Sequence, residues 1–236
     1  MRPQSEAIEA ALNELAEFSI FQGKSREQIL ALCEGGQIVA CAHRECLFQM
    51  GDEATFFGIV LGGAFKLSRP SLEGEDVIMH FPTAGDLVAA FILTQPKPVF
   101  PVTATAMGSS RFLKLPKEIY LTSWKAHPEL IFKVQEMLAT RMSILHDQKV
   151  LSKAPLSQKV AVLLMTLLKK NPNDLGFVNP PLTRKEIAES LGSSVESVIR
   201  IMSDWSKQGF IRTEDRQIQI LKPEKILEQA TFPAKS

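Results

Sequence analysis

The chain has 236 residues, with 27 Lys and Arg against 26 Asp and Glu and a formal net charge of +1, which is ordinary for a globular protein of two small domains. It contains no apolar run long enough to cross a bilayer and no signal peptide at its start, so we expect a cytoplasmic protein without membrane contact. Residues 1–151 carry 14 basic and 17 acidic side chains, a net of −3, whereas residues 152–236 carry 13 and 9, a net of +4. The basic carboxyl-terminal part is suited to binding a phosphate backbone.

The amino-terminal part has the pattern of helices followed by a small β domain. Residues 8–32 are predicted to be mostly helical, and most of the glycines lie before residue 115. Turns such as Gly51-Asp52-Glu53 and Gly85-Asp86 separate short apolar runs. Short strands at this spacing predict a sandwich or barrel.

A long helix is predicted to follow, beginning at Pro128, whose fixed φ suits the first turn of a helix. Its apolar positions recur at spacings of three, four and seven, close to the heptad pattern of a helix seam. Two interpretations remain open: the helix packs on its own β domain, or it pairs with a second copy of itself. The predicted seam consists of Ile131, Val134, Leu138, Arg141 and Leu145, with Arg141 interrupting its apolar character. Residues 152–155 are predicted to form a hinge, and Leu156 to Lys170 another helix.

Two short capped helices joined by a tight turn are predicted next. Thr183 and Glu186 have the spacing of a capping box, which begins a helix. Gly192 permits the turn, since glycine adopts positive φ at little cost. Ser193 and Glu196 repeat the box, with Ser193 or Ser194 as the N-cap residue. This pattern is typical of a helix-turn-helix.

The second helix has two contrasting faces. Val198, Ile201, Met202 and Trp205 form an apolar stripe that we expect to be buried. On the opposite face Arg200 could bond guanine, Glu196 could accept from cytosine, and Ile199 could meet a thymine methyl group or pack under the following hairpin. The alternative is a solvated Glu–Arg pair one turn apart, which contributes only a few tenths of a kcal/mol.

Residues 210–220 have the pattern of a β-hairpin, and a hairpin after a helix-turn-helix is a wing. A final short helix begins near Pro223. These elements predict two sets of contacts with double-stranded DNA. The predicted base contacts are Val195, Glu196, Ile199 and Arg200, and the predicted backbone contacts are Thr183, Ser194, Ser197, Ser203, Lys207, Arg212 and Arg216.

Together these segments resemble one family. Residues 47–54, 56–67 and 81–87 are similar to the β-roll of the CRP/FNR regulators, and the winged helix-turn-helix is similar to their DNA-binding domain. The resemblance implies an α+β fold: an antiparallel β-roll with amino-terminal helices in residues 1–116, a dimerisation helix in 117–151, and a winged helix-turn-helix in 152–236. It also implies a homodimeric transcriptional regulator, not an enzyme, that reads a TTGA-like inverted repeat and has RNA polymerase as a partner.

The residues that would bind cyclic AMP in this family are replaced. The Gly-Glu positions are Ala89 and Ala90, the Arg-Ser positions fall near Phe100 and Pro101, and the adenine-contacting hydroxyl pair falls at Leu145 and His146. A buried phosphate without a cation is costly, so we expect no dependence on cyclic AMP unless Lys97 substitutes. The alternative function, a cyclic-nucleotide-binding regulatory module, requires an intact pocket and no wing.

Other cofactors have little support in the sequence. A [4Fe–4S] cluster needs four cysteines, and the chain has only Cys33, Cys41 and Cys46. These thiols are more typical of buried small residues than of a zinc site with His43, so no metal site is predicted. Residues 102–106 and 195–200 resemble the branch that responds to nitrogen oxides and redox state, some members of which bind haem. Haem therefore stays open, as does a ligand-independent activator; the candidate haem ligands are His43, His80, His127, His146 and the methionines.

Overall fold

The structure is a computed structural model that describes residues 3–169, 176–214 and 216–230, with side chains described from residue 6 onward. The predicted segments above also include residues 1–2, 170–175, 215 and 231–236, which lie outside the described residues. The chain divides into two compact units, one formed by residues 1–69 and 79–144 and the other by residues 70–78 and 145–236. No described helix is long and apolar enough to cross a membrane.

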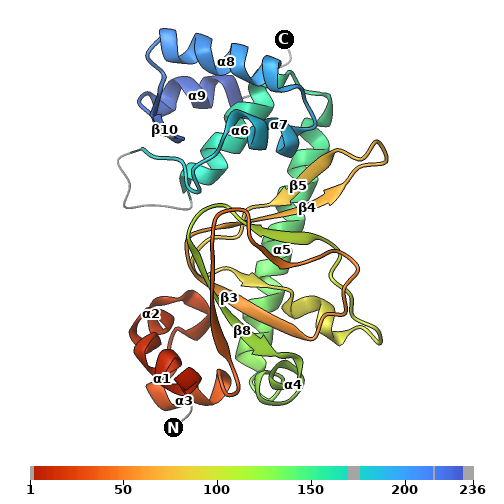
Figure 1. Ribbon diagram of the computed structural model, residues 1–236. Coiled ribbons are helices and arrows are strands. Elements are labelled where there is room, and N and C mark those ends of the chain that lie inside the picture. The colour runs from red at the N-terminus through yellow and green to blue at the C-terminus, as the bar shows by residue number, and fades with distance from the viewer. Residues whose placement is uncertain (1–2, 170–175, 215, 231–236) are drawn as a thin grey trace. The chain divides into compact units, whose positions relative to one another are not determined.

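Two four-stranded antiparallel sheets form the β-roll, which confirms the predicted run of short strands (Figure 1). In the first sheet the strand order is β1 (Gln37–Cys41), β8 (Ser110–Pro116), β3 (Phe56–Gly62) and β6 (Leu87–Val88). In the second the order is β2 (Cys46–Phe48), β7 (Thr103–Ala106), β4 (Phe65–Pro70) and β5 (Asp76–His80).

Strand β3 is the central buried element of the roll. Six of its seven residues are buried, as expected for a strand covered on both faces. Gly58 is required there, because a Cβ atom at this position would lie 1.9 Å from the carbonyl oxygen of Leu113 in β8. The close approach of β3 and β8 therefore depends on glycine.

Aromatic side chains fill the core of the roll. Phe48 and Phe100 stack with ring centroids 4.0 Å apart, and Phe56 packs 5.2 Å from Phe100. Phe57 meets Trp124 edge to face at 4.9 Å, a favoured geometry for aromatic pairs. The Trp124 indole N–H donates to the carbonyl of Leu32 at 3.0 Å, so this buried ring has its polar atom satisfied.

The predicted amino-terminal helical segment is confirmed as four short pieces: α1 (Pro3–Ala10), α2 (Leu12–Glu17), η1 (Ser19–Phe21) and α3 (Arg26–Leu32). They gather beside the sheets in Figure 1. Ser25 begins α3 with a capping box completed by Gln28. Further along the chain, η2 (Ala90–Thr94) follows β6, and α4 (Lys117–Ile119) with η3 (Tyr120–Trp124) leads into the long helix α5 (Pro128–Val150).

The second unit contains the winged helix-turn-helix. After η4 (Leu151–Lys153) come α6 (Leu156–Lys169), α7 (Arg184–Leu191), α8 (Val195–Lys207), the hairpin β9 (Ile211–Glu214) with β10 (Gln217–Ile220), and α9 (Pro223–Ala230). Helix α6 packs against α7, α8 and α9. The α+β class and the order of the predicted elements are thereby confirmed.

Candidate nucleic-acid interface

The turn between α7 and α8 is fixed at both ends by capping interactions. Thr183 is the N-cap of α7, and its reciprocal hydrogen bonds with Glu186 form the predicted capping box. Gly192 ends α7 in the left-handed conformation, with φ of 58°, where an L side chain would be strained. The geometry of this turn sets the direction in which α8 leaves it.

The second predicted capping box is wrong. Ser194, not Ser193, is the N-cap of α8, and its hydroxyl accepts from the Ser197 amide at 3.3 Å. The Ser193 amide instead donates to the carbonyl of Ala188 at 3.1 Å and so completes the end of α7. Because this amide is already used, Glu196 cannot close a box with it, and the Glu196 side chain is left exposed.

Helix α8 has the two faces that the sequence predicts. Val198, Met202 and Trp205 are buried, while Ile201 is half-buried. On the other side Glu196, Ile199, Arg200, Ser203 and Lys207 are exposed. Val195 and Ser197, at the start of the helix, are half-buried.

The exposed face of α8 presents hydrogen-bonding groups that are not used within the described part of the chain. The structure shows no ion pair between Glu196 and Arg200, although they are one turn apart. Ile199 lies between them in sequence with 46% of its surface exposed, so it is not packed under the hairpin. A carboxylate, a guanidinium and an exposed aliphatic side chain can together discriminate base edges.

The wing is the predicted two-stranded hairpin, and a third segment, residues 176–178, joins β10 through an isolated antiparallel bridge between Phe177 and Gln219. Beside the β9–β10 hairpin, the Val178 amide donates to Ile218 and the Ile220 amide donates to Gly176. Burial anchors the base of the wing through Ile211, Ile218 and Ile220. The third segment is too short and too rich in proline nearby for a strand to be predicted from its pattern.

The two predicted wing arginines differ in their setting. Arg216 is exposed at the hairpin turn, with positive φ of 68°. Arg212 donates to the Gln219 side chain at 2.8 Å across the hairpin, on the face that also carries Glu214. Arg216 is therefore better placed than Arg212 to contact a phosphate.

A contact that the sequence did not indicate links the helices to the wing. Arg184, the first residue of α7, donates from its guanidinium to the Thr213 hydroxyl in β9 at 2.9 Å. Burial lowers the pKa of this arginine from its ordinary value. The two residues are 29 positions apart, so no local pattern could have paired them.

The long helix α5 uses most of its predicted seam against its own β-roll. Val134 is 5% exposed within the roll's core, and Ile131 and Leu138 pack against that core. Arg141 donates to the Leu87 carbonyl at 3.3 Å, whereas Leu145 is exposed. Val134 therefore packs fully, and Ile131 and Leu138 in part, on the β domain of their own chain.

Comparison with known proteins matches both units. The model of the Crp-like helix-turn-helix domain matches residues 158–228, and that of the cyclic nucleotide-binding domain matches residues 38–123. The CRP-like cAMP-activated global transcriptional regulator of Mycobacterium tuberculosis is 26% identical over 221 residues, 92% of this chain and 98% of that protein. The transcriptional activator protein FnrA of Stutzerimonas stutzeri is 27% identical over 184 residues, 75% of this chain and 73% of that protein.

The fold is also similar to that of a solved structure. The structure of FixK2 from Bradyrhizobium japonicum superposes with a TM-score of 0.74 at 18% identity, over 84% of this chain and 99% of that chain. The chain belongs to the CRP/FNR family of transcriptional regulators. It is accordingly a DNA-binding regulator and not an enzyme, as the sequence predicted.

Three of the positions that the sequence resemblance assigns to the cyclic-nucleotide pocket of this CRP/FNR regulator hold buried apolar side chains. Ala89, Ala90 and Phe100 are buried, and Phe100 stacks on Phe48. Pro101 and Lys97 are exposed. None of the three buried side chains can neutralise a phosphate or bond a ribose.

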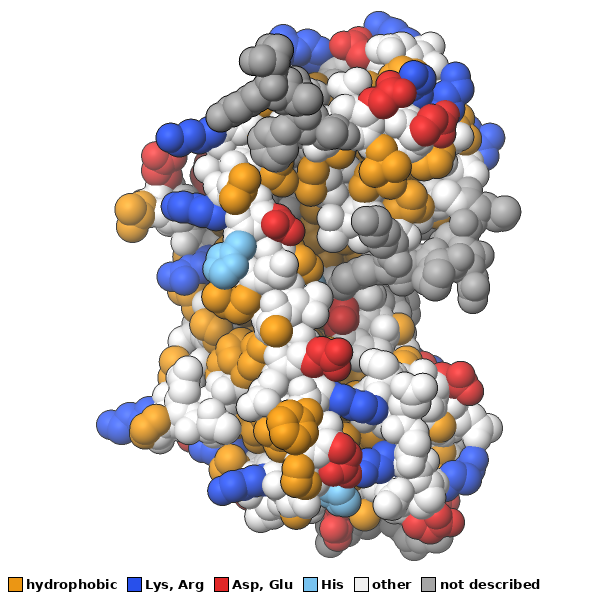
Figure 2. Space-filling model, turned by 180° about the vertical axis from the view of Figure 1, so that it is seen from behind, with side chains coloured by type: hydrophobic (Ala, Val, Ile, Leu, Met, Phe, Trp, Pro, Cys, Tyr) orange, Lys and Arg blue, Asp and Glu red, His pale blue; other side chains and the backbone are white. Residues whose placement is uncertain are grey.

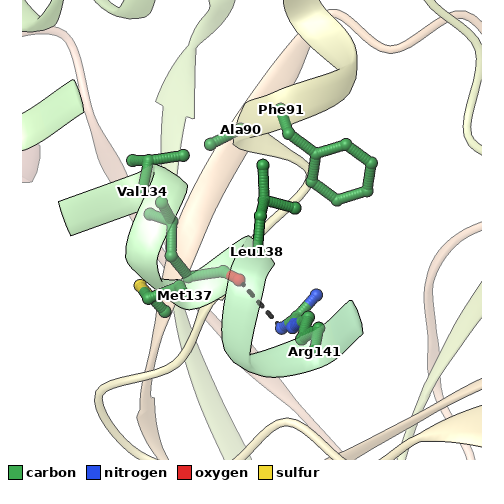
Figure 3. A pocket seen from close by; sticks show the side chains of 7 residues that line it. Ala90, Phe91, Val134, Met137, Leu138 and Arg141 are labelled. Carbon is green, nitrogen blue, oxygen red and sulfur yellow. Dashed lines mark hydrogen bonds between the residues drawn. The ribbon is translucent and has the colours of Figure 1, made fainter. Parts of the chain in front are cut away.

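A small pocket lies between η2 and α5, and Arg141 is its one charged lining residue (Figure 3). Burial lowers the pKa of Arg141, and the nearby carboxylate of Asp86 opposes that shift. The cavity volume is only about 10 Å³, room for about one water molecule. A cyclic nucleotide or haem needs several hundred Å³ and does not fit this pocket. The lining residues are Leu87, Ala90, Phe91, Val134, Met137, Leu138 and Arg141.

The cysteines and histidines considered for metals do not converge within the described residues, where no group of three potential ligands is close enough to hold an ion. Cys33 and Cys41 are buried and Cys46 is exposed, and burial raises the pKa of all three thiols. His43 lies 3.0 Å from the Met107 carbonyl and His127 lies 3.0 Å from Glu129. In both contacts the ring uses its Nδ1 atom.

Proposed function

We propose that the protein is a dimeric, sequence-specific transcriptional regulator that reads a TTGA-like inverted repeat without requiring cyclic AMP. The observation that carries this proposal is the exposed face of α8, where Glu196 and Arg200 are free of each other and Ile199 is exposed. Arg200 would donate to guanine O6 and N7, Glu196 would accept from the cytosine amine, and Ile199 would contact a thymine methyl group. Val195, half-buried at the start of α8, would approach the neighbouring base.

The surrounding polar side chains would contact the phosphate backbone. Thr183, Ser194 and Ser197 lie at the amino ends of α7 and α8, where helix dipoles favour an anion. Lys207 and Arg216 are exposed cations, and Ser203 shares the exposed face of α8. Arg212 would contribute only if its bond to Gln219 opened.

We also propose that the dimer forms through the outer face of α5. CRP/FNR regulators are generally dimeric, and a two-fold protein matches an inverted repeat. With Val134 and its neighbours held by their own β-roll, the remaining exposed apolar side chains of the helix include Phe132 at 68% and Met142 at 51% exposure. Ala139 lies between them at helical spacing. Figure 2 shows hydrophobic side chains among polar ones on the side of the molecule that carries α5.

The effector differs, in this proposal, from that of the cAMP-activated relative. The support comes from Ala89, Ala90 and Phe100, which are buried and apolar at the positions where the family resemblance expects the groups that bond phosphate and ribose. The protein would therefore act without a cyclic nucleotide, in the manner expected of the redox-responsive branch. Once bound in the cytoplasm to its operator, it would act on transcription by contacting RNA polymerase.

The test is selection from a library of random duplexes, with and without cyclic AMP. The proposal predicts that the full-length protein enriches an inverted repeat of TTGA-like half-sites equally in both conditions. Calorimetry with millimolar cyclic AMP should detect no binding heat. Enrichment only in the presence of cyclic AMP would refute the effector claim, and enrichment of no sequence at all would refute specific recognition.

A further inference from the structure

The hydrogen bond between Arg184 and Thr213 joins two parts of the DNA-binding unit that contribute different contacts. Arg184 begins α7, directly after the capping box at Thr183. Thr213 lies in β9, and its hydroxyl accepts from the Arg184 guanidinium at 2.9 Å. The bond therefore connects the helix-turn-helix to the wing through side chains.

The strand in which this bond forms has few buried side chains. Ile211, the first residue of β9, is buried, but the three residues that follow it are all exposed, whereas the partner strand β10 buries Ile218, opposite Thr213, and Ile220. Burial thus fixes β10 and the start of β9 and leaves the rest of β9 to be held by hydrogen bonds. Elements with few buried contacts open at low free-energy cost, so one bond from a fixed helix end has a large effect there.

The arginine end of the bond is well fixed. The reciprocal bonds of Thr183 and Glu186 hold the backbone at the start of α7. The Arg184 side chain is half-buried, which reduces the rotamer freedom that a surface arginine would lose on forming a bond. A planar guanidinium also directs its N–H groups along fixed directions.

We propose that Arg184 is a positioning residue, which acts through Thr213 to hold the wing in place so that Arg216 meets the DNA backbone while α8 occupies the major groove. This inference rests on the proposed DNA-reading function. Ordering the wing before binding removes an entropic cost from the binding step. The contribution is independent of sequence, because a backbone contact carries no base information.

The competing role for Arg184 is direct contact with a phosphate, and the two roles predict different effects of changing Thr213. If Arg184 acts through Thr213, then Thr213→Val, which removes the acceptor without changing charge, weakens DNA binding as much as Arg184→Met. Both variants also flatten the salt dependence of binding, because the wing cation loses its phosphate. If Arg184 binds phosphate itself, Thr213→Val leaves affinity and salt slope unchanged.

The experiment measures duplex binding of full-length protein at several salt concentrations for the parent, Thr213→Val, Thr213→Ser, Arg184→Met and the double variant Thr213→Val with Arg184→Met. We expect the affinity for the duplex to fall roughly tenfold in Thr213→Val and in Arg184→Met, with no further loss in the double variant. Thr213→Ser should bind with near-parental affinity, and the base preference should be unchanged in all variants. Thr122→Val is the matched control, since it also removes one threonine hydroxyl, in this case a donor to the Glu118 carbonyl, but lies in the other unit. Parental affinity in Thr213→Val would overturn the proposal.

A second measurement keeps the inference separate from the DNA-reading proposal. Amide hydrogen exchange in the DNA-free protein should be faster in β9 and β10 for Thr213→Val and Arg184→Met than for the parent, with exchange in α8 unchanged. Unchanged exchange in the wing would overturn the positioning role even if the parent binds DNA specifically. If exchange is faster in the variants but the parent binds no specific duplex, the contact between Arg184 and Thr213 is established. The proposed DNA-reading function is then refuted, and with it the role of Arg184 in DNA binding.

Discussion

Individual side chains on α8 divide into those that hold the helix and those that face outward. Val198 and Met202 are fully buried, and truncation of such residues typically costs about 2–5 kcal/mol of stability. Glu196 and Arg200 are exposed and make no bond to each other, so replacing them should change recognition and leave folding intact. Residues of the second kind are the ones that test base reading.

Arg200→Ala should weaken binding to the selected duplex by roughly 1–3 kcal/mol and relax the preference at one guanine. Lys207→Ala, at the exposed carboxyl end of the same helix, should weaken binding to all duplexes about equally. The measurement is a titration of both variants against a panel of single-base substitutions at fixed salt. An equal loss on every duplex for Arg200→Ala would make Arg200 a phosphate contact instead.

At the scale of elements, caps and burial determine where α5, α7 and α8 lie. The Thr183–Glu186 box, the left-handed Gly192 and the buried stripe of α8 place the recognition helix on a defined turn. On α5, burial of Val134 and the bond from Arg141 hold the helix against β6 and η2. These contacts are short-range for α7 and α8 but long-range for α5.

Thr183→Ala should lower the free energy of unfolding of the protein by about 0.5–2 kcal/mol, because the Glu186 amide loses its acceptor and the Glu186 carboxylate loses the hydroxyl donor. Chemical denaturation followed by circular dichroism measures this loss. Thr183→Ser is the matched control, since serine can form the same box. If the alanine variant were as stable as the serine variant, the box would not contribute to the stability of α7.

The sequence separation of the residues in contact explains what the sequence could predict. The Thr183 box, the turn at Gly192 and the two faces of α8 follow from residues a few positions apart, and all were predicted. The N-cap of α8 stayed open between Ser193 and Ser194 because the two side chains are chemically equal, and the predicted Ser193–Glu196 box does not form, since the Ser193 amide donates to the Ala188 carbonyl. The Arg184–Thr213 bond depends on tertiary packing and had no local signal.

The face of α5 that is buried could not be predicted for the same reason. An apolar stripe at heptad spacing is compatible with packing on the β-roll or on a second helix. In the structure Ile131, Val134 and Leu138 pack against the β-roll of their own chain. The apolar side chains of α5 that stay exposed for a partner are interrupted by polar ones and form no clear pattern in the sequence; they are Phe132, Met142, Leu145 and Val150.

For the whole molecule, reading of an inverted repeat requires two copies of the chain. Met142→Asp should convert the dimer to monomers, because it places a charge in the proposed helix–helix contact, where an unpaired charge is costly. Light scattering with chromatography measures the mass. Leu138→Asp is a less suitable test, because Leu138 also packs on its own β-roll and its replacement would reduce folding stability. A Met142→Asp protein that remained dimeric and folded would exclude this face of α5 as the main interface.

Dimeric reading of an inverted repeat can be tested by the binding of the protein to duplexes whose half-sites differ in spacing. Two recognition helices related by two-fold symmetry fit half-sites about 10–10.5 base pairs apart, centre to centre, or multiples of that distance. Insertion of five base pairs between the half-sites turns one of them to the opposite side of the duplex. The account predicts that affinity then falls to that of a single half-site and that a ten-base-pair insertion restores binding at least in part. Equal affinity for all three spacings would contradict dimeric reading of an inverted repeat.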